Sequence, residues 1–226
     1  MNTAIIVAAG SGTRFGAGRP KQFVEILGQP LITHTLDVFE NCPAIDEIVL
    51  VLPAAEIVNF QNKFNQRKLK IIVAGGVTRA ESVACGLRAI STKTEIVAVH
   101  DGARPLVAVE EIERTVDKAV ETGAACLVAR VNDTIKQISG EKIVGTIDRA
   151  QLRRALTPQC FRADILRQAF AGADLSDAAT DECFLVEKAG FPISVVEGSA
   201  RNIKITTPED LLLAEIFLNS PDAPGN

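Results

Sequence analysis

The sequence predicts a doubly wound α/β fold, in which helices cover both faces of a mostly parallel sheet and a β-hairpin arm protrudes from it. Short apolar runs recur along the chain and are separated by segments with helical spacing. The runs are rich in Val, Ile and Ala on both faces, which is typical of parallel strands covered on both sides. We expect one domain over residues 1–226, with ligands beyond the carboxyl ends of the strands.

The predicted strands have the sequences IIVA, EIVLVL, KIIVAG, EIVAVH, ACLVAR and PISVVEG. Helical spacing falls between them, over residues 30–40, 79–90 and 109–121. A last helix is predicted from Pro208 to Leu218, because Thr207 provides an N-cap and an acidic residue follows at N3. Residues 219–226 are expected to form a disordered tail.

The stretch 133–148, DTIKQISGEKIVGTID, interrupts this alternation. It predicts a strand, a turn at Ser139 and Gly140, and a second strand, and it is more polar than the sheet strands. One interpretation is a small surface hairpin. An isolated hairpin is only marginally stable in water, so the other interpretation is an arm that rests on a second subunit.

Composition excludes several classes of partner. The net charge of -4 and the pI near 5.3 argue against a nucleic-acid-binding surface. No apolar run is long enough for a membrane span, and the apolar start breaks at Gly10, too early for a signal peptide. The 5 cysteines are isolated, without a C-x-x-C pair, which is typical of a reducing compartment. We therefore expect a cytoplasmic protein without nucleic-acid or membrane partners.

A glycine-rich loop follows the first strand, with glycines at 10, 12 and 16 and cations at Arg14 and Lys21. The glycine spacing is one residue longer than the dinucleotide fingerprint, which disfavours an oxidoreductase, and Lys21 lacks the following Ser or Thr of a Walker loop. The layout lets loop amides surround triphosphate oxygens while the two cations neutralise charge on a transferred phosphoryl group. A flexible surface loop with solvated charges is the structural alternative.

A second motif, VHDGARP, closes the strand at residues 95–100. Asp101 at this strand end could hold Mg²⁺, or it could instead cap the following helix or pair with Arg104. His100 is expected on the opposite side of the strand, as a hydrogen-bonded core residue, and His34 is expected to be structural.

A third motif, GGVTRAESVACGL, joins a strand end to a helix that carries Arg79 and Ser82. Gly75 and Gly76 allow a ligand to approach the backbone, so a nucleotide base could be recognised there. A Gly-Gly connection before a helix is common, and an ordinary turn is the alternative.

Together these segments closely resemble one family, the cytidylyltransferases that make 4-diphosphocytidyl-2-C-methyl-D-erythritol in the non-mevalonate isoprenoid pathway. The resemblance runs in order through AAGSGTRFG, PKQF, GGVTRAESV, VHDGARP, NDTIK, TIDRAQLRRALTPQCF, TDE and EGSARNIKITTPEDL. It covers nearly the whole chain. The order of the motifs makes it far more specific than any one of them.

The resemblance implies a homodimeric enzyme that transfers CMP from CTP to 2-C-methyl-D-erythritol 4-phosphate and releases pyrophosphate, by in-line attack on the α-phosphorus. It implies that Arg14 and Lys21 stabilise the transition state and that Asp101 holds Mg²⁺ or another divalent cation. The implied CTP-binding residues are Ala8, Ala9, Gly10, Ser11, Gly12, Gly76 and Ser82. The implied acceptor-binding residues are Arg104, Thr134, Arg149, Thr180 and Lys204, with the arm reaching the partner subunit.

Two departures from the family pattern concern Val77 and Phe15. Many members carry an acidic residue where this chain has Val77, so recognition of cytosine there would rest on backbone groups. Phe15 replaces the usual Met and removes no charge. Two alternatives stay open: a cytidylyltransferase for another polyol phosphate, such as ribitol 5-phosphate, and a non-catalytic nucleotide-binding protein.

Overall fold

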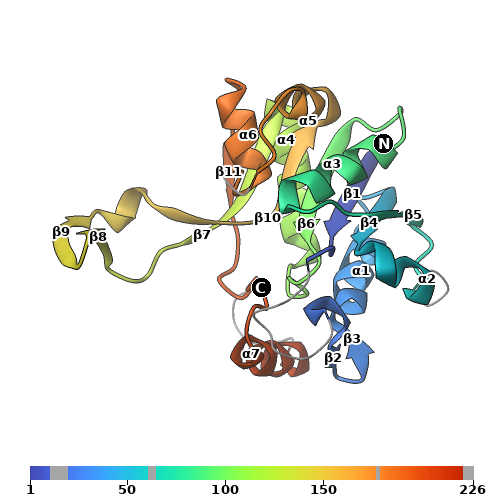
Figure 1. Ribbon diagram of the computed structural model, residues 1–226, viewed down its shortest axis with the longest axis horizontal. Coiled ribbons are helices and arrows are strands. Elements are labelled where there is room, and N and C mark those ends of the chain that lie inside the picture. Colours follow the sequence, from blue (N-terminus) through green and yellow to red (C-terminus); the bar gives the residue numbers. More distant parts are fainter. Residues whose placement is uncertain (11–19, 61–64, 177–178, 221–226) are drawn as a thin grey trace.

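The computed structural model of the protein describes residues 1–10, 20–60, 65–176 and 179–220. Its main sheet has seven strands in the order β11-β7-β10-β6-β1-β4-β5 (Figure 1). Six of them lie at the predicted apolar runs and confirm those predictions: β1 (Asn2–Val7), β4 (Glu47–Leu52), β5 (Leu69–Ala74), β6 (Ile96–Asp101), β7 (Ala124–Arg130) and β11 (Ser194–Glu197).

The sheet is mostly parallel, as predicted. β1 lies between β4 and β6 and is parallel to both, so that Ala4 is paired with Ile48 on one side and Ala98 on the other. The seventh strand, β10 (Arg153–Arg162), was not predicted and runs antiparallel between β6 and β7. Its register shifts between Ala155 and Gln159, the interval that contains Pro158, which has no N–H to donate to a ladder.

The predicted helices are confirmed as α1 (Leu31–Asn41), α3 (Arg79–Ala89), α4 (Val109–Thr122) and α7 (Pro208–Asn219). The Thr207 side chain accepts a hydrogen bond from the Asp210 N–H, as expected of an N-cap. Because α7 reaches Asn219, the predicted tail is wrong at that residue, and 221–226 lie outside the described residues. Elements without a sequence prediction are α2 (Ile57–Phe60), α5 (Ala163–Phe170), α6 (Glu182–Lys188), β2 (Glu25–Ile26), β3 (Gln29–Pro30), and the 3₁₀ turns η2 (Lys21–Phe23), η3 (Ala54–Glu56) and η4 (Arg149–Gln151).

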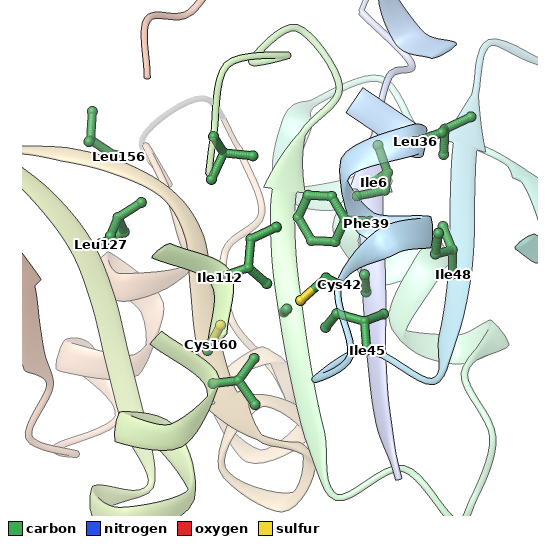
Figure 2. Packing of buried hydrophobic residues seen from close by; sticks show 14 of the residues in the cluster. Ile6, Leu36, Phe39, Cys42, Ile45, Ile48, Ile112, Leu127, Leu156 and Cys160 are labelled. Atoms are coloured by element: carbon green, nitrogen blue, oxygen red, sulfur yellow. The ribbon is translucent and has the colours of Figure 1, made fainter. Parts of the chain in front are cut away.

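Each face of the sheet carries its own hydrophobic layer, which confirms the doubly wound arrangement. On one face α1 and α4 contribute Phe39 and Ile112, which pack over the sheet together with Cys160 of β10 (Figure 2). On the other face α3 and α5 contribute Val83 and Leu166. Apolar side chains on both faces of the central strands therefore hold the helices in place.

A third, smaller cluster attaches α7 beyond the carboxyl end of β6. Ala214 of α7 packs with Ile26, Leu31, Ala103 and Ile205, all of them buried. The Ile205 N–H also donates to the Ala103 carbonyl oxygen at 2.9 Å. The segment before α7 is thereby fixed beside the end of β6.

The predicted hairpin arm is confirmed as β8 (Ile135–Ser139) and β9 (Lys142–Ile147), an antiparallel pair that forms a separate sheet. It projects away from the three layers on extensions of β7 and β10 (Figure 1). The turn lies at Gly140 and Glu141 rather than at Ser139 and Gly140, because Ser139 is paired with Lys142. Gly140 has a φ of 57°, which glycine adopts without strain.

Candidate active site

The carboxyl ends of β1, β5 and β6 meet at one edge of the sheet, as expected for parallel strands. Glycines allow the segments that follow to approach closely. A Cβ built on Gly75 would lie 2.3 Å from the Ala9 Cβ, and one built on Gly102 would lie 2.9 Å from the Ala8 Cβ. The start of the predicted phosphate loop therefore lies against both other motifs.

The glycine pair after β5 is joined to the start of α3. Ser82 is buried, its hydroxyl donates to the Thr78 carbonyl oxygen at 2.9 Å, and it accepts from the Gly76 N–H at 3.2 Å. The side chain of Val77 is 97% exposed, and its N–H donates to Glu81 Oε2 at 2.6 Å. The two predicted CTP-binding residues Gly76 and Ser82 are thus in direct contact, while Val77 offers an apolar side chain to solvent.

Asp101, at the end of β6, is the electrostatic centre of this edge. Arg79 Nε lies 2.9 Å from Asp101 Oδ1, while Arg104 Nε and Lys204 Nζ lie 3.3 Å and 3.0 Å from Oδ2. The ion pair with Arg104, which the sequence left open as an alternative to a metal site, is present. Two further cations from distant segments join it, so three positive charges surround one carboxylate of which only 9% of the side chain is exposed.

Arg79 bridges Asp101 to a second buried carboxylate. Its Nη1 lies 2.6 Å from Oε1 of Glu182, whose side chain is 1% exposed. The other oxygen of Glu182, Oε2, is buried without a hydrogen-bond partner among the described residues. Glu182 therefore depends on Arg79 for compensation of its charge.

The pKa values of the two carboxylates are shifted in opposite directions, although the shared guanidinium of Arg79 lowers both. Burial alone would raise the pKa of Asp101, but the charges of Arg79, Lys204 and Arg104 outweigh it and hold that pKa well below its ordinary value. Burial raises the pKa of Glu182, because Arg79 only partly offsets the loss of water. The difference follows from the number of cations around each group.

Lys21 lies beside the same cluster. Its Nζ donates to the Ile205 carbonyl oxygen at 2.7 Å, one residue beyond Lys204. The neighbouring Gln22 is buried and donates to the Ala8 carbonyl oxygen at 2.6 Å, which ties η2 to the end of β1. The predicted residues Ser11, Gly12 and Arg14 lie outside the described residues, as does Phe15.

Both histidines have the structural environments predicted for them. His100 is fully buried, and burial lowers its pKa to about 4. Its ring nitrogens contact Thr157 Oγ1 and the Arg104 carbonyl oxygen. His34 Nε2 lies 2.9 Å from the Ile26 carbonyl oxygen.

The remaining predicted acceptor residues make no described hydrogen bond or ion pair with the cluster around Asp101. Thr134 and Arg149 flank the arm and are exposed, and Arg149 Nη1 donates to the Asn132 carbonyl oxygen. Thr180 is exposed just before α6. In one copy of the chain, therefore, only Arg104 and Lys204 of the five predicted acceptor residues reach the cluster around Asp101 through the contacts described.

Sequence reasoning assigned no role to four residues that the structure brings to this edge. Arg79 and Glu182 form an ion pair, and Asn202 donates to the Thr157 carbonyl oxygen at 2.8 Å. All four lie within motifs that carry the family resemblance, which is the signal that could have drawn attention to them.

Comparisons with known proteins agree on one family. The family model described as 2-C-methyl-D-erythritol 4-phosphate cytidylyltransferase matches residues 2–220. A protein of that name from Geobacillus kaustophilus is 45% identical over 221 residues, covering 96% of each chain. Another from Syntrophus aciditrophicus is 41% identical over 225 residues, covering 97% of this chain and 96% of the relative.

Solved structures give the same result. A 4-diphosphocytidyl-2C-methyl-D-erythritol synthase from Anaerococcus prevotii superposes with a TM-score of 0.84 at 29% identity, covering 97% of this chain and 98% of that one. A 2-C-methyl-D-erythritol 4-phosphate cytidylyltransferase from Thermus thermophilus superposes with a TM-score of 0.78 at 32% identity, covering 97% and 100%.

We predict that Asp101→Asn lowers the free energy of unfolding by about 3 kcal/mol at neutral pH, because three cations lose their shared counterion. The pKa of Asp101 is depressed in the folded protein, so its stabilisation is present above its unfolded-state pKa and is lost as the pH falls through the lower, folded-state pKa. Urea unfolding from neutral to acid pH should therefore show the wild type and the variant converging below about pH 4.

Asp164→Asn is the matched control, because Asp164 pairs with Arg162 at 2.6 Å but its side chain is 65% exposed. We expect it to change the unfolding free energy by less than about 1 kcal/mol. If both substitutions lowered the free energy of unfolding equally at neutral pH, the three cations around Asp101 would not account for its effect.

Proposed function

The chain belongs to the family of 2-C-methyl-D-erythritol 4-phosphate cytidylyltransferases, and we propose that its reaction takes place at the sheet edge around Asp101. The enzyme transfers CMP from CTP to 2-C-methyl-D-erythritol 4-phosphate in isoprenoid biosynthesis, giving 4-diphosphocytidyl-2-C-methyl-D-erythritol and pyrophosphate. One observation supports this location above all: three cations from distant segments converge on Asp101, beside the end of the strand that precedes the glycine-rich loop.

The chemistry needs positioning and charge neutralisation more than proton transfer. An oxygen of the acceptor phosphate attacks the α-phosphorus of CTP in line, a new P–O bond forms, and the bond to the departing pyrophosphate breaks. The attacking phosphate is already ionised, so no strong base is required. Lys21 and Arg14 are proposed to stabilise the negative charge on the phosphates in the transition state.

The proposed CTP site lies over the ends of β1 and β5. Ala8, Ala9 and Gly10 begin the loop that is proposed to surround the phosphates, together with Ser11 and Gly12. Gly76 and Ser82 are proposed to contact the cytidine. Because Val77 offers no polar side-chain atom, backbone groups are proposed to recognise cytosine there.

We propose that Asp101 would hold a divalent cation, Mg²⁺ or another, that would neutralise charge on the CTP phosphates. The donor set fits this ion, since Mg²⁺ usually takes one or two carboxylates together with substrate phosphates. The described residues hold no group of three or more His, Cys, Asp and Glu side chains suited to a metal. When bound, the ion neutralises phosphate charge, while Arg79 keeps Glu182 as its second partner.

The acceptor phosphate is proposed to bind Arg104 and Lys204 at the cluster. Thr134, Arg149 and Thr180 are proposed to complete the acceptor site. Thr180 lies two residues before Glu182, which is joined to Asp101 through Arg79, whereas Thr134 and Arg149 flank the arm. An acceptor site built from residues of two copies of the chain would bring these groups together.

We propose a homodimer in which each arm reaches the partner's site. The arm carries exposed apolar side chains: Ile138 is 68% exposed, Ile143 65%, Val144 58% and Ile147 40%. A two-stranded hairpin with such an apolar surface is marginal in water and gains stability by docking on a second copy.

The cytoplasm is the proposed location. The five cysteines are all free thiols in the structure, which suits a reducing compartment. As a separate observation, none of the described helices combines the length and the apolar character needed to cross a bilayer.

Pyrophosphate release from CTP tests the substrate directly. We expect the purified protein to release pyrophosphate with 2-C-methyl-D-erythritol 4-phosphate at least about tenfold more efficiently than with ribitol 5-phosphate, because a site built to pair with a particular acceptor discriminates against others. Equal efficiency with both acceptors would favour a broader polyol phosphate cytidylyltransferase.

We predict that Lys21→Ala lowers turnover by about a hundredfold or more, with a much smaller change in the KM for CTP, because its charge acts mainly on the transition state. Steady-state kinetics at saturating acceptor measure both. Lys70→Ala is the control, since Lys70 is exposed and donates to the Arg67 carbonyl oxygen. A Lys21→Ala enzyme with near wild-type turnover would remove Lys21 from the mechanism.

Subunit mixing tests the arm. If each site combines Lys21 of one copy with Arg149 of the other, then mixing inactive Lys21→Ala with inactive Arg149→Ala subunits restores one intact site in each mixed dimer. Random exchange gives mixed dimers for half of the molecules, so activity should recover to about a quarter of the wild-type rate. Subunit exchange demonstrated by mass spectrometry without recovered activity would place the arm at the site of its own copy.

A further inference from the structure

His100 lies directly behind the candidate site and has no role in the chemistry proposed above. It precedes Asp101 in β6, so its side chain points to the opposite face of the sheet. The ring is 0% exposed and packs against Phe39, with 4.8 Å between ring centroids. A buried imidazole with both nitrogens engaged cannot contact substrate directly.

The hydrogen bonds of His100 determine where its proton lies. Nε2 is 3.1 Å from the Arg104 carbonyl oxygen, which can only accept, so Nε2 carries the hydrogen. Nδ1 is 2.9 Å from Thr157 Oγ1, which also accepts from the Asp101 N–H at 3.2 Å. Full burial disfavours a charged ring, so Nδ1 accepts the hydroxyl hydrogen of Thr157.

These hydrogen bonds form a closed network of four residues. His100 binds the Thr157 hydroxyl, Asn202 Nδ2 donates to the Thr157 carbonyl oxygen at 2.8 Å, and Arg104 Nη1 donates to the Asn202 carbonyl oxygen at 2.8 Å. The Arg104 carbonyl oxygen completes the network by accepting from His100 Nε2–H. The network joins β6, β10 and the segment that carries Lys204, and a buried network of this kind restricts the movement of all its members.

We propose that His100, in its neutral Nε2–H form, is a positioning residue for the acceptor phosphate. It fixes the main chain of Arg104 directly and the segment of Lys204 through Thr157 and Asn202, so that both cations reach Asp101 and the acceptor in a defined geometry. The inference rests on the proposed acceptor-binding role of Arg104 and Lys204. The described hydrogen bonds of Gly76 and Ser82 do not involve this network, so the proposed cytidine contacts should depend on it less than the acceptor site does.

Two amide substitutions separate the two nitrogens of His100. His100→Gln places an amide near the Nε2 position and keeps a donor for the Arg104 carbonyl oxygen, whereas His100→Asn reaches only the Nδ1 position and loses it. We expect His100→Asn to raise the KM for the acceptor about tenfold, the effect of one buried hydrogen bond, and His100→Gln to raise it clearly less. The KM for CTP should change much less than the KM for the acceptor in both variants.

Nitrogen NMR of histidine-labelled protein gives a readout that does not depend on activity. The chain has 2 histidines, so His34→Gln assigns the signals, and we expect His100 to carry its hydrogen on Nε2. A hydrogen on Nδ1 would overturn the proposal. So would equal acceptor KM values in the two amide variants, or a loss of thermal stability in both without any change in acceptor KM.

Lys204→Ala tests the underlying acceptor role separately. We expect it to raise the acceptor KM at least as much as His100→Asn does, because it removes a cation proposed to touch the phosphate. An unchanged acceptor KM in Lys204→Ala would overturn the acceptor role of that cation, and with it the positioning role of His100. If Lys204→Ala raised the acceptor KM as expected but the two amide variants had equal acceptor KM values, only the role of His100 would be overturned.

Discussion

The buried charge of Asp101 is the constraint on which this edge of the molecule depends. An isolated carboxylate removed from water costs several kcal/mol, so it must be met by cations and hydrogen-bond donors. Arg79 comes from α3, Arg104 from the loop after β6, and Lys204 from the segment before α7. Three segments that are far apart in the sequence are therefore held at one strand end by a shared electrostatic requirement, and Glu182 extends the same requirement to α6.

This arrangement also explains how an acidic protein can bind two polyanionic substrates. The chain has a net charge of -4, yet at this edge three cations face the two buried carboxylates, with Lys21 close by. The surplus of positive charge is local and attracts phosphates, while it opposes the approach of a bare divalent cation. Since Mg²⁺ usually binds one or two carboxylates together with substrate phosphates, the proposed metal ion would be held more readily once CTP is present.

The sequence predicted what depends on local pattern. Six of the seven sheet strands are apolar runs, and α7 has its own N-cap at Thr207, so both could be recognised without tertiary information. β10 could not, because Pro158 interrupts it and its pairing depends on a register shift between two neighbouring strands. The same distinction applies to the site. Asp101 and Arg104 share one motif, whereas Arg79 and Glu182 are 103 positions apart and are paired only because the tertiary fold brings the start of α3 to the start of α6.

The division of the candidate acceptor residues follows from the same topology. Arg104 and Lys204 are held by Asp101, whereas Thr134 and Arg149 flank the arm, which leaves the sheet between β7 and β10 (Figure 1). At that base Arg153 Nε lies 2.6 Å from Glu197 Oε1, which ties β10 to β11 at the edge of the sheet, away from Asp101. An acceptor site that needs both groups cannot close through the described contacts of a single copy. If the arm docks on a second copy, the cations around Asp101 would bind the acceptor phosphate and the partner would supply the remaining polar contacts, so dimer formation and acceptor recognition would be one event.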